Sequence, residues 1–464
     1  MNEQTDKSAE QPKSPLREII QPFIDVVHAP RALWGVNVSY LLEGFCYFGV
    51  VGYLAMYFNQ YVNLSDTQAG PMVGVLTWGI TLSMFFFGGR ADKWGVRVAL
   101  IAAICLMIVG RVLLASGPYL GLASGLWSPL FFLSLAGLLF VILGYGMYQP
   151  AAYAAVRQFT TPKTAGMGYA MLYALMNLGG WLPTWFSPIR KSVGISGAYW
   201  VYVGFTVLGL ILLATILSRK TVERAIAQAR AASGNADEKP AAEAAKSKPK
   251  EPFSILKWLK NHPLADRKFA FFIFALIPVQ TLFAHNWLTL PMYVERAYRG
   301  SWIGDHFEAA TNFNPLLIFI LVPIVAAVSQ KRKVYNMMIA GTAVMAAPTF
   351  LLALGPSFWT LLGYLVLMTV GEAMWQPRFL QYAAEIAPKG RTGAYMGVAQ
   401  FPWFLTKVIT SLYSGWFLAH YCPKEGPTNT QTMWLIYGFI AISSTVVLVL
   451  AKGWLGKDFK TKAE

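Results

Sequence analysis

The chain has 464 residues, of which 56% are hydrophobic and 13% charged, with a mean hydropathy of +0.46. So apolar a composition excludes an ordinary soluble globular protein and predicts a polytopic membrane protein. The formal net charge of +16 does not indicate nucleic-acid binding, because the basic residues gather in loops, tails and one polar central segment, where a membrane would place them.

Residues 1–33 are polar and lack an apolar core of signal-peptide type, so we expect the first span to act as its own insertion signal. Twelve apolar stretches follow, each near or above the roughly 20 residues that cross the hydrocarbon. We therefore predict an all-α membrane protein with twelve transmembrane helices in two six-helix bundles. The stretches cover residues 34–58, 70–89, 98–117, 129–156, 167–187, 196–218, 269–294, 313–329, 334–354, 357–384, 394–419 and 432–451.

A polar segment rich in Ala, Lys, Glu and Pro separates six spans from six. Its composition favours a solvated tether, with a frayed helix at 221–231 and an amphipathic surface segment at 253–259 as further options. Because one set of short loops carries most of the loop Lys and Arg, the positive-inside rule places both termini and the linker in the cytoplasm. The predicted parts are an N-terminal tail (1–33), an N-terminal bundle (34–218), a linker (219–268), a C-terminal bundle (269–451) and a C-terminal tail (452–464).

The two halves share a motif. Residues 144–150 in the fourth span read GYGMYQP, and residues 371–377 in the tenth read GEAMWQP. Two bundles built on one plan are expected of a transporter that rocks around a central site and exposes it alternately to each side.

The loop between the second and third spans, residues 88–97, reads GGRADKWGVR. Gly88 would allow close helix packing, Gly95 a tight turn, and Asp92 could accept hydrogen bonds at a helix N-terminus. The loop resembles the G-x-L-A-D-R-x-G-R-K signature of the major facilitator superfamily. That resemblance implies that the loop, Arg97 included, latches the two bundles together on the cytoplasmic side.

Five further segments form a pattern along the chain: 43–49 (EGFCYFG), 173–179 (YALMNLG), 312–315 (NFNP), 371–372 (GE) and 395–397 (YMG). Together they resemble the proton-dependent oligopeptide transporter branch of that superfamily, which implies proton-coupled transport of peptide-like solutes. The chain departs from the branch at Tyr40, Gly44 and Gln149, which stand where the branch carries a carboxylate, an arginine and a lysine that bind the peptide carboxylate and pass protons.

Five charged side chains fall inside the predicted spans: Glu43, Arg111, Glu372, Arg378 and Lys407. An ionised group at bilayer depth costs at least about 2.5 kcal/mol, so such groups usually pair, face water or handle a ligand or a proton. Glu43 and Glu372 approach the midplane from opposite ends of their spans. We predict that these two carboxylates couple transport to protons.

The three cations leave more than one role open. We expect Lys407 to pair with Glu372, as a gate or a static pair, or to hold a substrate carboxylate once Glu372 is protonated. Arg378 is expected to snorkel toward the cytoplasmic vestibule, whereas Arg111 could pair with Glu43 or reach headgroups. The residues assigned to gating are Gly88, Asp92, Gly95, Arg97, Arg111 and Arg378.

Polar and aromatic side chains in the same spans complete the predicted substrate site, because small-molecule sites combine apolar walls with a few polar anchors. Neither a cofactor nor a metal is expected. The assigned residues are Tyr47, Gln149, Tyr173, Asn177, Gln280, Asn286, Trp375, Gln376, Trp403 and Lys407.

The sequence thus predicts a secondary active transporter that works by alternating access, a proton symporter of small polar or zwitterionic, peptide-like solutes. A proton-coupled exporter of drugs or metabolites and a facilitative uniporter are the alternatives. ATP-driven transport is unsupported, because no G-x-x-x-x-G-K-[ST] loop occurs. A membrane enzyme or sensor would need a catalytic constellation or a soluble domain, and neither is evident. The expected partners are the solute, protons and the lipid bilayer, with no nucleic acid, for a monomer in the plasma membrane (the inner membrane in a bacterium).

Overall fold

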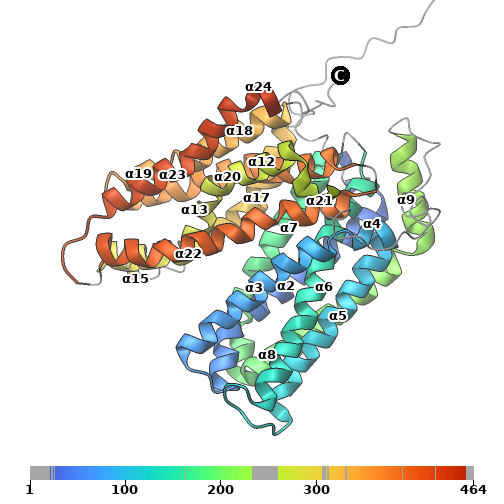
Figure 1. Cartoon of the computed structure of the whole chain (residues 1–464), viewed down its shortest axis with the longest axis horizontal. Coiled ribbons are helices and arrows are strands. Elements are labelled where there is room, and N and C mark those ends of the chain that lie inside the picture. Colours follow the sequence, from blue (N-terminus) through green and yellow to red (C-terminus); the bar gives the residue numbers. More distant parts are fainter. Residues whose placement is uncertain are drawn as a thin grey trace, which may run out of the picture.

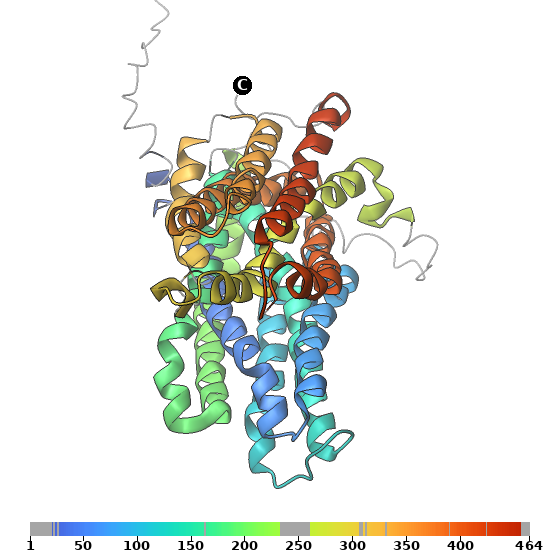
Figure 2. The same cartoon turned by 90° about the vertical axis from the view of Figure 1, so that its left-hand side faces the viewer.

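The structure is a computed structural model that describes residues 21, 24–25, 27–161, 164–232, 260–305, 310, 313–329, 332–388, 390–423 and 425–455. Within these residues the regular elements are all helical. Two groups of helices are seen in both views, one coloured blue to green and the other yellow to red (Figures 1 and 2). We call them the N-terminal and C-terminal bundles.

The helices of the N-terminal bundle include several of 30 residues or more, long enough to cross a membrane at an angle. They are α2 (Arg31–Gln60), α3 (Asp66–Phe87), α4 (Arg90–Trp94), α5 (Val96–Ser116), η1 (Gly117–Tyr119), α6 (Pro129–Phe159), α7 (Ala165–Trp181), η2 (Leu182–Phe186) and α8 (Ser187–Ile216).

The C-terminal bundle is built from more and shorter pieces. They are η3 (Pro263–Ala265), α12 (Arg267–Ala275), α13 (Ile277–Leu288), α14 (Leu290–Ala297), α15 (Trp302–Asp305), α17 (Phe313–Val328), α18 (Val334–Ala346), α19 (Thr349–Leu352), α20 (Phe358–Ile386), α21 (Thr392–Ala399), α22 (Phe401–Tyr421), α23 (Thr430–Leu450) and α24 (Lys452–Leu455).

Eight of the described helical segments are long and apolar enough to cross a membrane, and Pro71–Phe87 and Phe313–Val328 are shorter apolar helices. The chain is therefore a multi-pass helical membrane protein, and the number of twelve spans stays a prediction. The eight are Arg31–Gln60, Val96–Tyr119, Pro129–Phe159, Ser192–Ile216, Arg267–Asn286, Val334–Leu352, Phe358–Ile386 and Thr430–Leu450.

Four predicted spans are interrupted at or just before a proline, and one of them, 334–354, breaks at Ala347 before Pro348. The stretch 167–187 changes from α7 to the 3-10 helix η2 ahead of Pro183. The stretch 269–294 breaks at Leu276 before Pro278, and 394–419 breaks at Gln400 before Pro402. Proline has no N–H and its ring clashes with the preceding turn, so each run of hydrogen bonds stops there and a new helix begins.

Glycines set how closely the long helices approach. A Cβ built on Gly144 of α6 would lie 2.7 Å from the carbonyl oxygen of Ala103 in α5. A Cβ on Gly341 of α18 would lie 2.7 Å from the Trp375 Cβ in α20. Small residues at such crossings let backbones pack in lipid, where apolar burial alone does not drive helices together.

The first part of the predicted linker is an ordered helix, α9 (Arg219–Ala231), so the expectation of a solvated tether is wrong there. The Ser218 side chain caps α9 by accepting a hydrogen bond from the Thr221 N–H at 3.2 Å. Ala225 and Ala229 are buried as α9 packs against α2 and α6. These alanines thus form the apolar face by which α9 packs against the N-terminal bundle. The segment 253–259 lies outside the described residues.

The two bundles meet at one end and diverge away from it. Figure 1 shows them together near α4 and α21 and apart at α8 and α15. We call the joined end the basic end, because Arg90, Arg157 and Arg391 lie there.

Candidate functional site

The best connected carboxylate between the bundles belongs to Glu372 of α20, which is 2% exposed. Its Oε1 accepts a hydrogen bond from the hydroxyl of Tyr173 in α7 at 2.5 Å, across the two bundles. Its Oε2 accepts one from Nδ2 of Asn314 in α17 at 2.7 Å. Both bonds go to the acceptor oxygens of a carboxylate, so the geometry suits the ionised form.

Two neighbours fix this arrangement. Asn314 Nδ2 also donates to Thr369 Oγ1 at 3.0 Å, and Asn177 Nδ2 donates to the Tyr173 backbone oxygen at 3.0 Å. The sequence analysis placed Tyr173, Asn177 and Glu372 in the site but left out Asn314 and Thr369. Asn314 could have been found, because it lies in the NFNP segment that resembles the peptide transporter branch.

Three predicted glutamines have a side-chain oxygen that is buried and without a hydrogen-bond partner in the described part of the chain. They are Gln149 in α6, Gln280 in α13 and Gln376 in α20. Gln149 and Gln376 occupy equivalent positions of the repeated motif. Unpaired buried acceptors are costly unless something donates to them, so these amides are candidate contacts for a solute.

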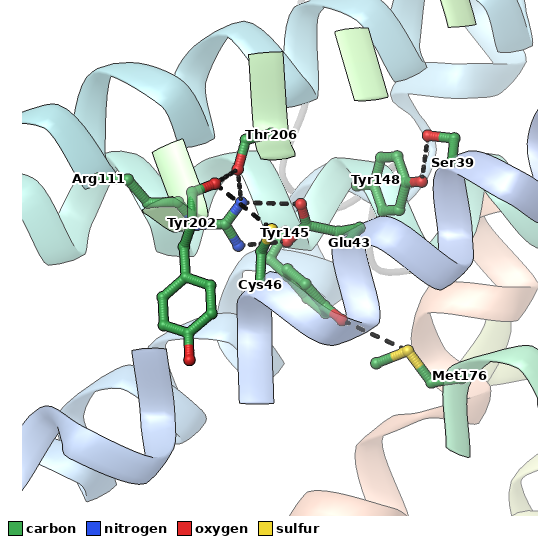
Figure 3. Close-up of polar contacts among 9 residues, drawn as sticks. All are labelled: Ser39, Glu43, Cys46, Arg111, Tyr145, Tyr148, Met176, Tyr202 and Thr206. Atoms are coloured by element: carbon green, nitrogen blue, oxygen red, sulfur yellow. Dashed lines mark hydrogen bonds and ion pairs between the residues drawn. The ribbon is translucent and has the colours of Figure 1, made fainter. Parts of the chain in front are cut away.

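The second predicted carboxylate lies within the N-terminal bundle. Glu43 of α2 forms a buried ion pair with Arg111 of α5, whose Nη1 donates to Glu43 Oε2 at 2.8 Å (Figure 3). Arg111 Nη1 also donates to Thr206 Oγ1 of α8 at 2.6 Å. Of the two possibilities for Arg111, the structure shows the pair with Glu43 rather than contact with headgroups. Thr206 was missed by the sequence analysis.

Aromatic rings lie beside this pair. The ring of Tyr47 stacks on Tyr145 with centroids 4.6 Å apart. The Tyr145 hydroxyl reaches the Met176 sulfur at 4.0 Å, and the Cys46 thiol donates to the Tyr202 backbone oxygen (Figure 3). Tyr47 is 8% exposed, so its ring contributes packing on the N-terminal side of the site.

At the basic end, Asp92 of α4 joins the two bundles. Its Oδ1 accepts from the Gly393 N–H at 3.0 Å and its Oδ2 from the Ala394 N–H at 3.1 Å. Both N–H groups open α21, where the helix dipole favours a negative charge. The predicted contact of Asp92 with a helix N-terminus is therefore present, and it ties α4 to the opposite bundle.

Arg157 of α6 makes a second tie across the bundles. Its Nη1 donates to Thr392 Oγ1 at 2.6 Å and to the Ala387 backbone oxygen at 3.2 Å. The sequence analysis assigned Arg157 no role and missed this contact. Together with Asp92 it closes the basic end in this structure.

Two predicted glycines fit their expected roles. Gly95 has a φ of 82°, a conformation that side chains rarely adopt, at the turn between α4 and α5. A Cβ on Gly88 would lie 3.0 Å from the Gly393 oxygen and 3.2 Å from the Gly397 Cα. Gly88 therefore lets α3 touch α21 of the opposite bundle.

We expect Gly88→Ala to open the basic end, because the added methyl would force α3 and α21 apart. Gly89→Ala is the matched control, since its Cβ would lie 3.5 Å from the Ala394 Cβ, an ordinary contact. Spin labels on cysteines at Lys93 and Lys333, both exposed at this end, would report a longer distance population only for Gly88→Ala. Equal distances in both variants would contradict this role.

The closure at Asp92 should also depend on pH. Burial raises the pKa of Asp92 to about 6, although the N–H groups of Gly393 and Ala394 oppose the shift. When the bundles separate, water restores an ordinary aspartate pKa near 4. The closed form therefore binds a proton more tightly, and its population should rise as the pH falls from about 7 through 6, levelling off near 4.

The same pair of labels would measure this pH dependence. Asp92→Asn cannot titrate and should lose the part of the response that lies between about pH 4 and 6. A wild-type response that equals that of Asp92→Asn would show that another group is responsible.

The hydrogen bonds of Arg378 and Arg97 stay inside their own bundles, although the Arg378 guanidinium also lies beside Gly166 of α7. Arg378 is 5% exposed and donates to the Ser329 backbone oxygen at 2.8 Å and to Gln381 Oε1 at 2.9 Å. Arg378 does not snorkel in this structure, because its guanidinium donates to these buried acceptors. Arg97 Nε donates to the Leu217 oxygen at 2.6 Å and so holds the end of α8.

The predicted pair of Lys407 and Glu372 is absent, and Lys407 makes no ion pair within the described residues. The Glu372 carboxylate instead accepts hydrogen bonds from Tyr173 and Asn314. The Lys407 ammonium lies 5.2 Å from the ring centroid of Trp403 on its own helix.

Two further predicted residues lie inside the C-terminal bundle. Trp375 is fully buried, and its Nε1 donates to the Met345 sulfur at 3.1 Å. Asn286 Oδ1 accepts from the Tyr364 hydroxyl at 3.5 Å. Neither residue makes a hydrogen bond to Glu372 or Tyr173 among the described residues, although Tyr364, the partner of Asn286, lies within electrostatic reach of Glu372. The described residues contain no cluster of three or more His, Cys, Asp or Glu side chains that could hold a metal ion.

Known proteins share this fold and sequence pattern. Residues 36–411 match the family model of the Major Facilitator Superfamily. Dipeptide and tripeptide permease B of Yersinia enterocolitica (serotype O:8 / biotype 1B) is 21% identical over 94% of this chain and 97% of the permease.

Solved structures agree at the level of the fold. The proton:xylose symporter XylE gives a TM-score of 0.64 at 17% identity, covering 91% of this chain and 96% of XylE. A peptide transporter POT in complex with sulfate gives a TM-score of 0.59 at 17% identity, covering 93% and 96%. The similarity to the permease and to the peptide transporter structure confirms the resemblance of this chain to the proton-dependent oligopeptide transporter branch. The chain belongs to the major facilitator superfamily and is a membrane transporter rather than an enzyme.

Proposed function

We propose that the chain is a proton-coupled symporter of small polar or zwitterionic, peptide-like solutes that works by alternating access. The permease relative and the peptide and xylose transporters of the same fold support this choice. We place it in the plasma membrane as a monomer, with the basic end and both termini in the cytoplasm, following the positive-inside rule.

The proposal rests mainly on one observation: the Glu372 carboxylate accepts a hydrogen bond from the Tyr173 hydroxyl of the opposite bundle. Protonation removes the charge and turns one acceptor oxygen into a donor, so the charge-assisted bond from the Tyr173 hydroxyl weakens. The contact between α7 and α20 then loosens at mid-depth. A proton on Glu372 thereby biases which side of the membrane the central site faces.

The structure is closed at the basic end by Asp92 and Arg157 and divergent at the other end (Figure 1). In the proposed orientation this is an outward-facing form. Solute and proton would enter from outside, and release would need separation of α4 from α21. Tyr173, Gln149 and Gln376 are the proposed first contacts of the solute, because two of them offer unpaired oxygens.

Proteoliposomes that contain the purified protein and a trapped pH dye would test this proposal. Solutes from a di- and tripeptide panel should acidify the lumen when added outside, and a pH gradient should drive their accumulation. Solute uptake without acidification would favour a uniporter instead. Proton coupling at Glu43 stays a prediction that the same assay tests with Glu43→Gln.

A further inference from the structure

The helix that carries Lys407 differs in composition from its neighbours. α22 has 21 residues, yet among the described helices it is not one of those apolar enough to cross a membrane. Lys407, Ser411 and Gly415 follow one another at a spacing of four residues and so share one face of α22. A helix inside the bundle that carries such a face needs a polar environment beside it.

The neighbours of α22 show where this face points. On one side, Trp403 packs against Phe283 of α13 with ring centroids 4.7 Å apart. On the other side, the ring centroid of Phe401 lies 5.9 Å from that of Phe85 of α3 in the opposite bundle. At 100° per residue, the face with Lys407 lies between these two contacts. It therefore borders the region between the bundles.

That face is open beyond the contact with α3. Lys407 is six residues, about 9 Å, further along α22 than Phe401. Ser411 is exposed, and a Cβ built on Gly415 would meet nothing within 4 Å. The exposed positions of this face thus lie on the part of α22 that diverges from the N-terminal bundle (Figure 1).

The Lys407 ammonium has aromatic contacts but no anion. Its Nζ lies 5.2 Å from the ring centroid of Trp403 and 5.4 Å from that of Phe404. Within the described residues it makes neither an ion pair nor a hydrogen bond. Cation–π contacts of this kind leave the three N–H donors of an ammonium unused. The ammonium is therefore able to take an acceptor, best a negative one.

We propose that Lys407 binds a carboxylate of the transported solute, which makes the substrates small organic monoanions or zwitterions. The inference rests on the proposed transport function and narrows its substrate class. One ammonium matches a single negative charge, whereas a phosphate group carries nearly two charges and is usually held by an arginine fork or several donors. Arg111 cannot serve here, because its guanidinium is bound to Glu43 and Thr206.

The placement of Lys407 also orients the solute. The carboxylate would lie against the C-terminal bundle, while the unpaired oxygen of Gln149 offers an acceptor on the N-terminal bundle for an amino or amide N–H. A solute with both groups would span the two bundles. This arrangement favours amino acid or peptide-like zwitterions over neutral sugars and over cations.

Matched pairs that differ only in charge test the proposal. Calorimetry on the purified full chain at pH 7 would compare phenylacetate with phenylacetamide, and alanyl-phenylalanine with its C-terminal amide. We expect the wild type to bind at least one carboxylate about tenfold more tightly than its amide, as loss of one charge-assisted hydrogen bond typically costs. Lys407→Gln should remove the difference, Lys407→Arg should keep it, and Lys452→Gln, which removes an exposed cation of α24, should match the wild type.

The proposal is wrong if the wild type never prefers a carboxylate to its amide. It is equally wrong if the preference survives in Lys407→Gln. Lys407→Met is the second neutral variant should Lys407→Gln not fold. Because no gradient is applied, an uncoupled transporter would show the same preference, so failure of proton coupling and failure of this inference are separate results.

Discussion

Glu372→Gln should abolish proton-driven accumulation of solute while exchange of solute across the membrane, measured without a pH gradient, continues. The amide has nearly the shape of the carboxyl group, and its oxygen can still accept a hydrogen bond from the Tyr173 hydroxyl. It cannot gain or lose a proton. Accumulation under an inward proton gradient should therefore fall to the level of empty vesicles, because the two bundles rock without a titrating group between them.

Glu385→Gln is the matched control, because Glu385 lies on the same helix nearer the basic end and accepts a hydrogen bond from Gln381 of that helix, which the amide can keep. That variant should accumulate solute as the wild type does. Accumulation by Glu372→Gln at the wild-type level would show that the proton travels elsewhere. If it survived in Glu43→Gln as well, proton coupling through either predicted carboxylate would be wrong.

The helices could be predicted from sequence, while the partners of their polar side chains could not. Hydropathy alone locates the long segments, because about 20 apolar residues have one stable arrangement in lipid. The breaks at Leu276 and Gln400 were not predicted, although Pro278 and Pro402 mark them. An apolar run gives no sign of its own where a proline ends one helix and begins the next.

The directions of the polar side chains could not be predicted from sequence. The expected depths of Glu372 and Lys407 suggested a pair, but Glu372 meets Tyr173 and Lys407 meets Trp403. The same ambiguity left Arg111 with two options and directed Arg378 toward the cytoplasmic vestibule, because sequence spacing does not tell which helix a side chain faces.

The contact of Asp92 with a helix N-terminus could be predicted for a different reason. The turn at Gly95 and the close approach at Gly88 both need glycine, so the local sequence itself constrains the backbone of this loop. Arg157, which makes the parallel tie, has no such local signature. It looks like any loop cation until the opposite bundle is in place.

The largest effect on stability is expected from Arg111→Met. The change would leave the ionised Glu43 buried at 4% exposure without its partner, whereas the Thr206 hydroxyl would keep its hydrogen bond to the Tyr202 oxygen. Removing one member of a buried ion pair costs about 3–5 kcal/mol, because the remaining charge keeps its desolvation penalty. The melting temperature in detergent and the yield of folded protein should both drop sharply. Arg224→Met, an exposed position on α9, should change neither.

The double variant Glu43→Gln/Arg111→Met separates the ion pair's two roles. It leaves no charge stranded, so most of the lost melting temperature should return, as it does when buried pairs are replaced together. If the pair only holds α2 against α5, the double variant should also keep proton-driven accumulation. If Glu43 carries a proton, stability should return while accumulation stays lost. Melting temperatures of Arg111→Met and the wild type that agree would instead mean that water reaches Glu43, and the buried pair would not be a structural element at all.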